Sequence, residues 1–233
     1  MPPAIFLLTT AASLTPAIAG ACGADAIIID LAATDGVARA QTVSLITACQ
    51  TPAPCPALYV RIHAFSSGLA EADLAAVMTA HPDGILLADC QSGAEVQKLD
   101  VLMSVHEAEL GRSAAPAGII AEFGTTARNL LANSSYGNRS RRLSGLLWNE
   151  TLLAGSLGLS PDNDLSGHDI VRFGRSMAVL RASEAGVAAI AVLHGTGAEH
   201  GARARADGFS GVAVADLDAV KSSASRLESL TKI

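Results

Sequence analysis

Short, continuous apolar runs alternate along the chain with longer stretches of helical periodicity, and most runs end on a polar residue. Continuous apolar runs are typical of strands in a parallel sheet that is buried on both faces. The predicted strands are residues 4–8, 26–30, 58–63, 84–89, 118–122, 145–149, 187–194 and 211–216. Eight strand-then-helix units in 233 residues predict an α/β fold, a (β/α)8 TIM barrel, as a single domain over residues 1–233.

The polar residues that end the predicted strands are the first candidates for chemistry, because TIM-barrel active sites lie at the C-terminal ends of the strands. Arg61 and His63 are two residues apart, so their side chains share a face if the strand continues to residue 63. Arg61 is interpreted either as a cation that faces a ligand or as a structural ion-pair partner of Asp30 or Asp89. Glu122 ends the fifth predicted strand and adds a further carboxylate.

Composition excludes several function classes. Half of the residues are hydrophobic and 3% are aromatic, so the core must be built from Ala, Val, Ile and Leu. A net charge of −6 argues against nonspecific nucleic-acid binding, which relies on basic patches. The one basic cluster, Arg139, Arg141 and Arg142, is interpreted as a solvated loop rather than an anion site.

The apolar N-terminal stretch and the cysteines bear on the compartment. Residues 1–23 lack a Lys or Arg before the apolar run, so residues 4–8 are interpreted as a strand and not a signal peptide. No run reaches the ~18 apolar residues that span a bilayer, so no membrane partner is expected. Four cysteines without a C-x-x-C pair argue against zinc and favour free thiols in a reducing cytoplasm.

A set of segments spread over nearly the whole chain resembles one enzyme family. The matching segments, in order, are Gly23–Leu31 (G-A-D-A-V-I-L-D-L), Val60–His63 (V-R-V-N), Glu71–Leu74 and Pro82–Leu87 (E-A-D-L and P-D-G-I-V-L), Ser92–Val96 (S-A-A-D-V), Thr126–Arg128 (T-A-R), Gly145–Leu147 with Leu157–Gly158 (G-L-L and L-G), and Gly208–Gly211 (G-F-D-G). The ordered set resembles the citrate lyase beta-subunit and malyl-CoA lyase family, the HpcH/HpaI aldolases.

The resemblance implies a TIM barrel that makes or breaks a carbon–carbon bond next to a thioester through an enolate. In the family, Mg2+ is held by a Glu after strand five and an Asp after strand six, and it stabilises the negative charge. An Arg after strand three neutralises carboxylate or carbonyl oxygens. The implied partners are a small carboxylate or a CoA thioester, and a second copy of the chain in a homo-oligomer.

The sequence departs from the family pattern at the chemistry. The metal-binding Glu and Asp of the family fall on Thr125 and Leu152. Further functional residues of the family are replaced as well. The family's D-L-E-D reads Asp30–Ala33, without the last two acids, and its P-K-V-E-S reads Ala88–Ser92, without the lysine and the glutamate. The G-K that ends G-F-D-G-K reads Gly211–Val212, and the late His-Pro pair reads Ala215–Asp216. Of the functional set only Arg61 remains, with His63 in place of Asn.

Two hypotheses follow. In the first, the chain is a non-catalytic or partner paralogue that has lost the metal-dependent lyase reaction. In the second, it is an active Mg2+-dependent lyase: Arg61 binds substrate beside Asp30 and Asp89, and His63 is the acid or base. The metal would then be held by Glu122 with Glu150 or Asp89, which requires a shift of register.

A third and less favoured reading is an unrelated phosphate-binding isomerase barrel. It is disfavoured because the chain lacks a phosphate loop of good pattern after strand seven or eight. Gly195–Gly197, flanked by His194 and His200, is a separate candidate phosphate-binding loop, but loop histidines are more often solvated.

Overall fold

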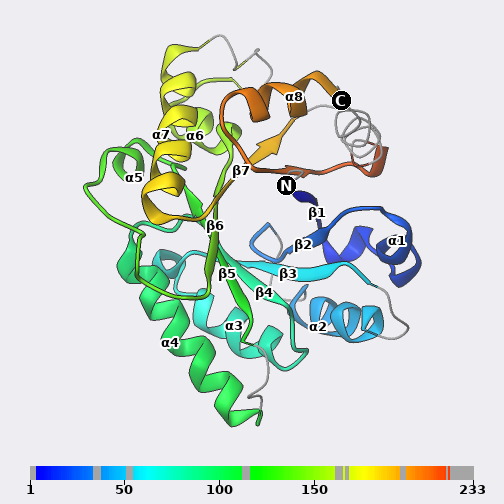
Figure 1. Ribbon diagram of the computed structural model, residues 1–233. Coiled ribbons are helices and arrows are strands. Elements are labelled where there is room, and N and C mark those ends of the chain that lie inside the picture. The colour runs from blue at the N-terminus through cyan, green and yellow to red at the C-terminus, as the bar shows by residue number, and fades with distance from the viewer. Residues whose placement is uncertain are drawn as a thin grey trace.

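The structure is a computed structural model, and it describes residues 4–33, 38–50, 55–111, 116–160, 165, 168–194, 198–218 and 220 (Figure 1). The strands are β1 (Ala4–Thr9), β2 (Ala26–Asp30), β3 (Ala57–Ile62), β4 (Gly84–Leu87), β5 (Gly118–Phe123), β6 (Leu143–Trp148), β7 (Ala188–Leu193) and β8 (Gly211–Val214). The helices are α1 (Pro16–Ala21), α2 (Ala38–Cys49), α3 (Ala70–Met78), α4 (Gly93–Glu109), α5 (Ala127–Leu131), α6 (Glu150–Ser156), α7 (Asp169–Ala185) and α8 (Ala198–Ala206).

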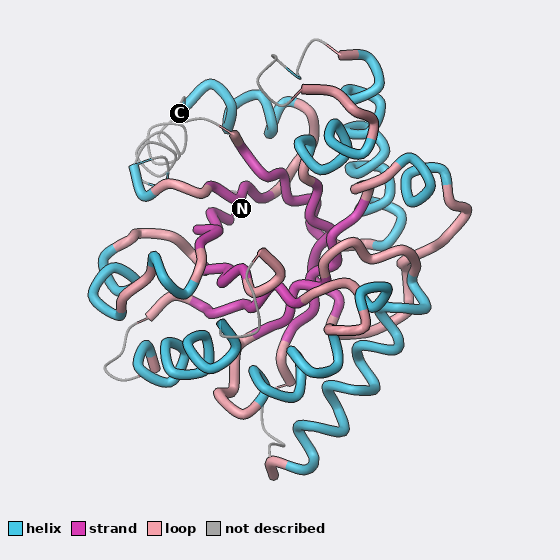
Figure 2. The backbone as a smooth tube through the Cα atoms, turned by 180° about the vertical axis from the view of Figure 1, so that it is seen from behind, coloured by secondary structure: helices cyan, strands magenta, loops and turns pink. Residues whose placement is uncertain are grey.

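The strands close into a parallel barrel in the order of the sequence. Each strand pairs with the next, and β8 pairs with β1 through the partners Ala4 and Gly211. Seen from the far side, the strands form a ring and the helices lie around it (Figure 2). The predicted TIM barrel is therefore confirmed, and the N-terminal apolar run is its first strand.

Two layers of apolar side chains follow from the alternation of strand residues. The interior layer holds Phe6, Ala26, Ile28, Leu86, Ile120, Leu147, Ile190, Val192 and Ala213. A larger cluster fills the space between the strands and the helices. Because the interior is packed with side chains, a ligand can enter only at the mouth, where the strands end.

Five strands, β3, β4, β6, β7 and β8, end one or two residues earlier than the sequence predicts, and two of these ends bear on the mouth. β3 stops at Ile62, because the backbone N–H of His63 donates to the carboxylate of Asp73 in α3, at 3.0 Å, instead of extending the ladder. β4 stops at Leu87, and Asp89 adopts a left-handed backbone with φ of 42°. Both residues therefore belong to the loops at the mouth.

Among the described helices, none is long and apolar enough to cross a membrane.

Candidate functional site

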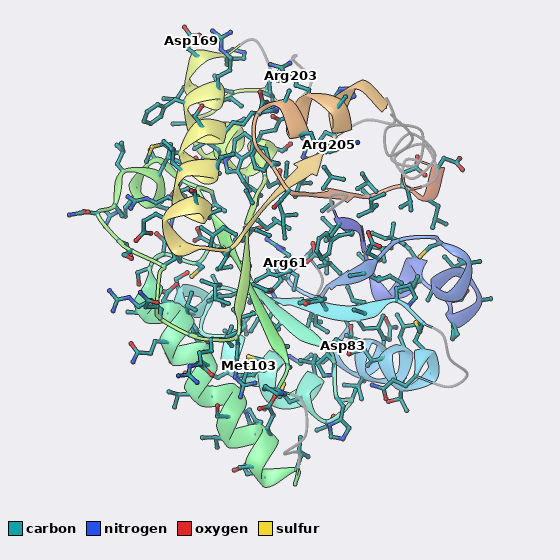
Figure 3. All side chains as sticks on the ribbon, viewed as in Figure 1. Arg61, Asp83, Met103, Asp169, Arg203 and Arg205 are labelled. Atoms are coloured by element: carbon teal, nitrogen blue, oxygen red, sulfur yellow. The ribbon has the colours of Figure 1, made fainter. Side chains whose placement is uncertain are left out.

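Arg61 lies on β3 at the mouth of the barrel. In the strand register it is level with Asp30 of β2 on one side and Leu86 of β4 on the other. Leu86 belongs to the interior layer, and Tyr59, two residues before Arg61, packs against that layer. The Arg61 side chain therefore starts from the inner face of the sheet, and it lies near the centre of the molecule in Figure 3.

The guanidinium of Arg61 binds two carboxylates from two other strands. Its Nε donates to Glu122 Oε1 at 3.2 Å, and its Nη2 donates to Glu122 Oε2 at 2.8 Å. Its Nη1 donates to Asp30 Oδ1 at 3.0 Å. The pairing of Arg61 with Asp30 agrees with the structural interpretation from the sequence, whereas the two-point pairing with Glu122 was not foreseen.

This cluster is shielded from solvent. The Arg61 side chain is 14% exposed and the Glu122 side chain 2%. Burial by itself disfavours the charged guanidinium, but the charges and hydrogen bonds of Glu122 and Asp30 outweigh it and raise the pKa of Arg61. Two-point arginine–carboxylate pairs are among the stronger charge-assisted hydrogen bonds, so the cluster is a stable feature of the mouth.

Glu122 was a candidate metal ligand, and its oxygens are already occupied. Besides Arg61, its Oε2 accepts the backbone N–H of Asp89 at 3.0 Å. A metal ion would have to compete for these lone pairs with a guanidinium and an amide. The donor set around Glu122 therefore does not fit a divalent cation without a rearrangement of Arg61.

Asp89 turns away from Arg61. Its carboxylate accepts hydrogen bonds from the hydroxyl of Thr125 and from Gln91 Nε2, the latter at 2.6 Å. Asp89 meets the arginine cluster only through its backbone bond to Glu122. Of the two predicted partners of Arg61, Asp30 and not Asp89 forms the ion pair. The Asp89 carboxylate binds Gln91 and Thr125 instead, and Thr125 stands at the family's metal-ligand position.

Glu150, the second candidate metal ligand, lies in a different cluster. It opens α6, and its Oε2 accepts from Arg175 Nη2 at 2.6 Å, while Arg175 Nη1 binds Asp207 at 2.9 Å. Each of the two glutamates is thus held by its own arginine, and no contact joins them within the described residues. Over that part of the chain no group of three or more His, Cys, Asp or Glu is arranged to hold a metal.

His63 belongs to a chain of polar contacts at the rim. Its Nδ1 lies 2.6 Å from Asp73 Oδ2, and Asp73 Oδ1 accepts from Arg39 Nε at 2.7 Å. Asp73 is fully buried, whereas the His63 side chain is 19% exposed. Asp73 orients the His63 ring, as a carboxylate orients the imidazole in many catalytic sites. Sequence reasoning missed Asp73 and Arg39, although Asp73 stands in the E-A-D-L segment, in the first turn of α3.

A further polar pair lies at the ends of β6 and β7. His194 Nε2 is 3.0 Å from Asn149 Oδ1, which also caps α6 by accepting the N–H of Thr151. The candidate phosphate-binding loop, residues 195–197, lies outside the described residues. His194 itself is therefore tied to an amide that structures the helix after β6.

Solved structures resemble this chain over almost its whole length. RipC from Yersinia pestis is 22% identical, with a TM-score of 0.71, and the match covers 97% of this chain and 94% of that one. CitE from Mycobacterium tuberculosis in complex with magnesium and acetate is 22% identical, with a TM-score of 0.74 and coverage of 97% and 91%. The citrate lyase beta subunit from M. tuberculosis, complexed with oxaloacetate and magnesium, is 27% identical, with a TM-score of 0.70 and coverage of 95% of each chain.

Among curated protein sequences, none matches this chain significantly. The family model described as HpcH/HpaI aldolase/citrate lyase matches residues 4–218, which is almost the entire barrel. The chain therefore belongs to the HpcH/HpaI aldolase/citrate lyase family.

Proposed function

We propose that this chain is a divergent member of its family that has lost the metal-dependent lyase reaction and serves as a non-catalytic or partner paralogue. The proposal places the protein in the cytoplasm as a homo-oligomer. The ligand class expected at the mouth of the barrel is a small carboxylate or a CoA thioester. Arg61, Asp30 and Asp89 are the residues that would border such a ligand, with His63 at the rim.

One observation carries the proposal: Arg61 at the mouth is already paired with carboxylates of its own chain. The Nε, Nη1 and Nη2 of Arg61 all donate to carboxylates of the same chain. A substrate carboxylate would have to displace Glu122, which is held nearby by the fold and therefore competes at a high effective concentration. The arginine that would bind a substrate carboxylate is thus already hydrogen-bonded before any ligand arrives.

The two positions that match the family's metal ligands support the same conclusion. Thr125 is buried and uses its hydroxyl to bind Asp89. Leu152 is 36% exposed and carries no oxygen ligand at all. Mg2+ requires several oxygen ligands in octahedral geometry, and an apolar side chain supplies none. Neighbouring structures contain magnesium with acetate or oxaloacetate, and we infer that this chain has lost that capacity.

A gain-of-function experiment tests the proposal. The double variant Thr125→Glu with Leu152→Asp restores both family ligands, and isothermal titration with Mg2+ should then show binding that the unmodified protein lacks. Leu131→Asp in the Thr125→Glu background is the matched control, because Leu131 is 73% exposed and takes the same change at a position that matches no metal ligand of the family. Mg2+-dependent cleavage or condensation by the unmodified protein, assayed with oxaloacetate and acetyl-CoA, would overturn the proposal.

The second candidate function is an active lyase, favoured by the oriented His63. With Asp73 holding its Nδ1, His63 would act through Nε2 as an acid or base next to the mouth. Under this function, Asp73→Asn should lower the rate of a lyase reaction without changing the affinity for its substrate. The same assay of the unmodified protein decides between the two functions.

A further inference from the structure

A cavity lies at the seam where the barrel closes, beside the C-terminal ends of β1 and β8. Leu7 of β1 and Val214 of β8 are the last residues that pair across this seam. Beyond them β1 continues to Thr9 and leads into a short 3-10 helix, η1 (Ala11–Ser13), whereas β8 ends at Val214. The next helix, α1, is only six residues long, and a cavity of about 270 Å³ remains between these segments.

The lining of this cavity combines aliphatic side chains with a few polar ones. The aliphatic part of the lining consists of Leu7, Leu14, Ile18 and Leu217. The polar part consists of Thr9, Ser13 and Asp216. Within the described part of the chain, no aromatic or basic residue lines the cavity. The cavity therefore offers a ligand an aliphatic surface and one negative charge.

The polar residues of the lining have unused capacity to accept hydrogen bonds. Asp216 Oδ1 accepts the backbone N–H of Asp218 at 2.9 Å, whereas Oδ2 has no partner among the described residues. The Thr9 hydroxyl likewise has no partner in that part of the chain. Ser13 Oγ lies 3.2 Å from Thr10 Oγ1, and a hydroxyl oxygen can accept a further bond. Three residues that border the cavity can therefore each accept a donor from a ligand.

Two further features of the lining come from a departure of this chain from its family. The late His-Pro pair of the family reads Ala215–Asp216 here, and both residues line the cavity. The exchange of an imidazole for a methyl group leaves more room, and the exchange of a proline for an aspartate adds a carboxylate. Like charges repel each other at a binding site, so Asp216 disfavours an anionic ligand and favours a cationic one.

We propose that this cavity is a binding site for a small primary alkylamine in its ammonium form. An alkylammonium, like a lysine side chain, is protonated at pH 7 and offers three N–H donors. The donors match the oxygens of Asp216, Thr9 and Ser13, and the alkyl chain matches the aliphatic lining. The volume of about 270 Å³ is roughly nine times that of one water in the liquid, so the alkyl chain is short. The lining does not include Arg61, so the site stands whether or not the lyase reaction has been lost.

A titration of the full chain with n-pentylamine tests the site, by isothermal calorimetry at pH 7 and low ionic strength. We expect saturable binding with a Kd on the order of 1 mM, as is typical of so small a ligand. The uncharged n-pentanol should bind at least about fivefold more weakly, because it lacks the charge pair. In methyl NMR spectra, n-pentylamine should shift the signals of Leu14 and Ile18, and pentanoate should not. The absence of saturable n-pentylamine binding, or equal affinity for n-pentanol, would overturn the proposal.

Three variants locate the binding. Asp216→Asn removes the charge but keeps an oxygen for the N–H of Asp218, and it should weaken n-pentylamine at least about fivefold while n-pentanol is unaffected. Asp218→Asn makes the same change of net charge at a residue outside the lining and should leave the affinity nearly unchanged. Ala215→Leu, at an exposed position, should fill the cavity and prevent binding of both ligands. Equal losses in Asp216→Asn and Asp218→Asn, or unchanged binding in Ala215→Leu, would contradict the proposed site.

Discussion

Two arginines at opposite ends of the barrel make almost the same set of contacts. Arg61 at the mouth holds Asp30 and Glu122, and Arg142, just before β6, holds Asp100 and Glu107. Their side chains are 14% and 13% exposed, and each has one nearly buried carboxylate partner. In both, the partners outweigh the burial that opposes the charge and raise the pKa of the arginine.

The difference lies in what the partners join. Asp100 and Glu107 are both on α4, so Arg142 fastens one helix to the N-terminal face, where it also donates to the carbonyl of Ala117 at 3.2 Å. Asp30 and Glu122 come from β2 and β5, so the Arg61 contacts close the mouth itself. Identical ion chemistry thus stabilises the fold at one end and, under our proposal, blocks a ligand site at the other.

The interpretation of Arg139, Arg141 and Arg142 as a solvated loop is wrong for Arg142. Arg139 and Arg141 are exposed, but Arg142 binds two acids and lies largely out of solvent. Sequence distance hid this, because Asp100 and Glu107 are 42 and 35 residues from Arg142 and meet it only after α4 packs on the barrel.

The largest effect is expected for Arg61→Ala. The change leaves Glu122, which is 2% exposed, as a buried charge without its partner. Stability should fall by about 3–5 kcal/mol, the cost of breaking a buried pair from one side. Chemical denaturation measures it, and the double variant Arg61→Leu with Glu122→Leu should recover much of the loss. A fall below about 1 kcal/mol would mean that the pair is solvated.

Arg142→Ala should cost less, roughly 2–3 kcal/mol. Asp100 is 28% exposed and can be hydrated, and Glu107 keeps the backbone N–H of Ala117 at 2.9 Å. The same denaturation experiment gives the comparison between the two ends. A larger loss than for Arg61→Ala would reverse the order proposed here.

Glu122→Gln tests whether the internal carboxylate of Glu122 blocks ligand binding to Arg61. It removes the internal carboxylate but keeps its shape, at a cost of about 1–2 kcal/mol in stability. The freed Nε and Nη2 of Arg61 should then bind oxaloacetate, seen by isothermal titration as heat that the unmodified protein lacks. Glu107→Gln makes the same change beside Arg142 and should bind none. Equal oxaloacetate binding by the unmodified protein and Glu122→Gln would show that Glu122 does not block the mouth.

The smallest effect is expected for Lys98→Ala, at a surface pair. Lys98 Nζ lies 2.7 Å from Glu71 Oε1, with side chains 50% and 62% exposed, and it also lies over the ring of Phe65. Stability should change by less than about 1 kcal/mol, because solvent screens an exposed pair. A loss as large as that of Arg142→Ala would show that exposure is not what separates these clusters.

Much of the site could be assigned to the mouth from the sequence, but its pairing could not. The polar ends of the apolar runs placed Asp30, Arg61 and Glu122 at one end of the barrel, because the pattern of a parallel strand is local. Which acid would take Arg61 depended on strand register and barrel closure, and three carboxylates competed for it. Asp30 and Glu122 both bind Arg61, Glu122 at two points, whereas the Asp89 carboxylate binds Thr125 and Gln91 instead.

By itself, the sequence determined the barrel, the order of its strands and the loss of the family's acids at the mouth. These properties follow from hydrophobic pattern and residue identity, which are present in the unfolded chain. The tertiary structure alone decided that Arg61 is neutralised by carboxylates of its own chain and that Asp73 orients His63. Such contacts join residues from different elements, and their ångström-scale geometry exists only once the helices have packed around the closed sheet.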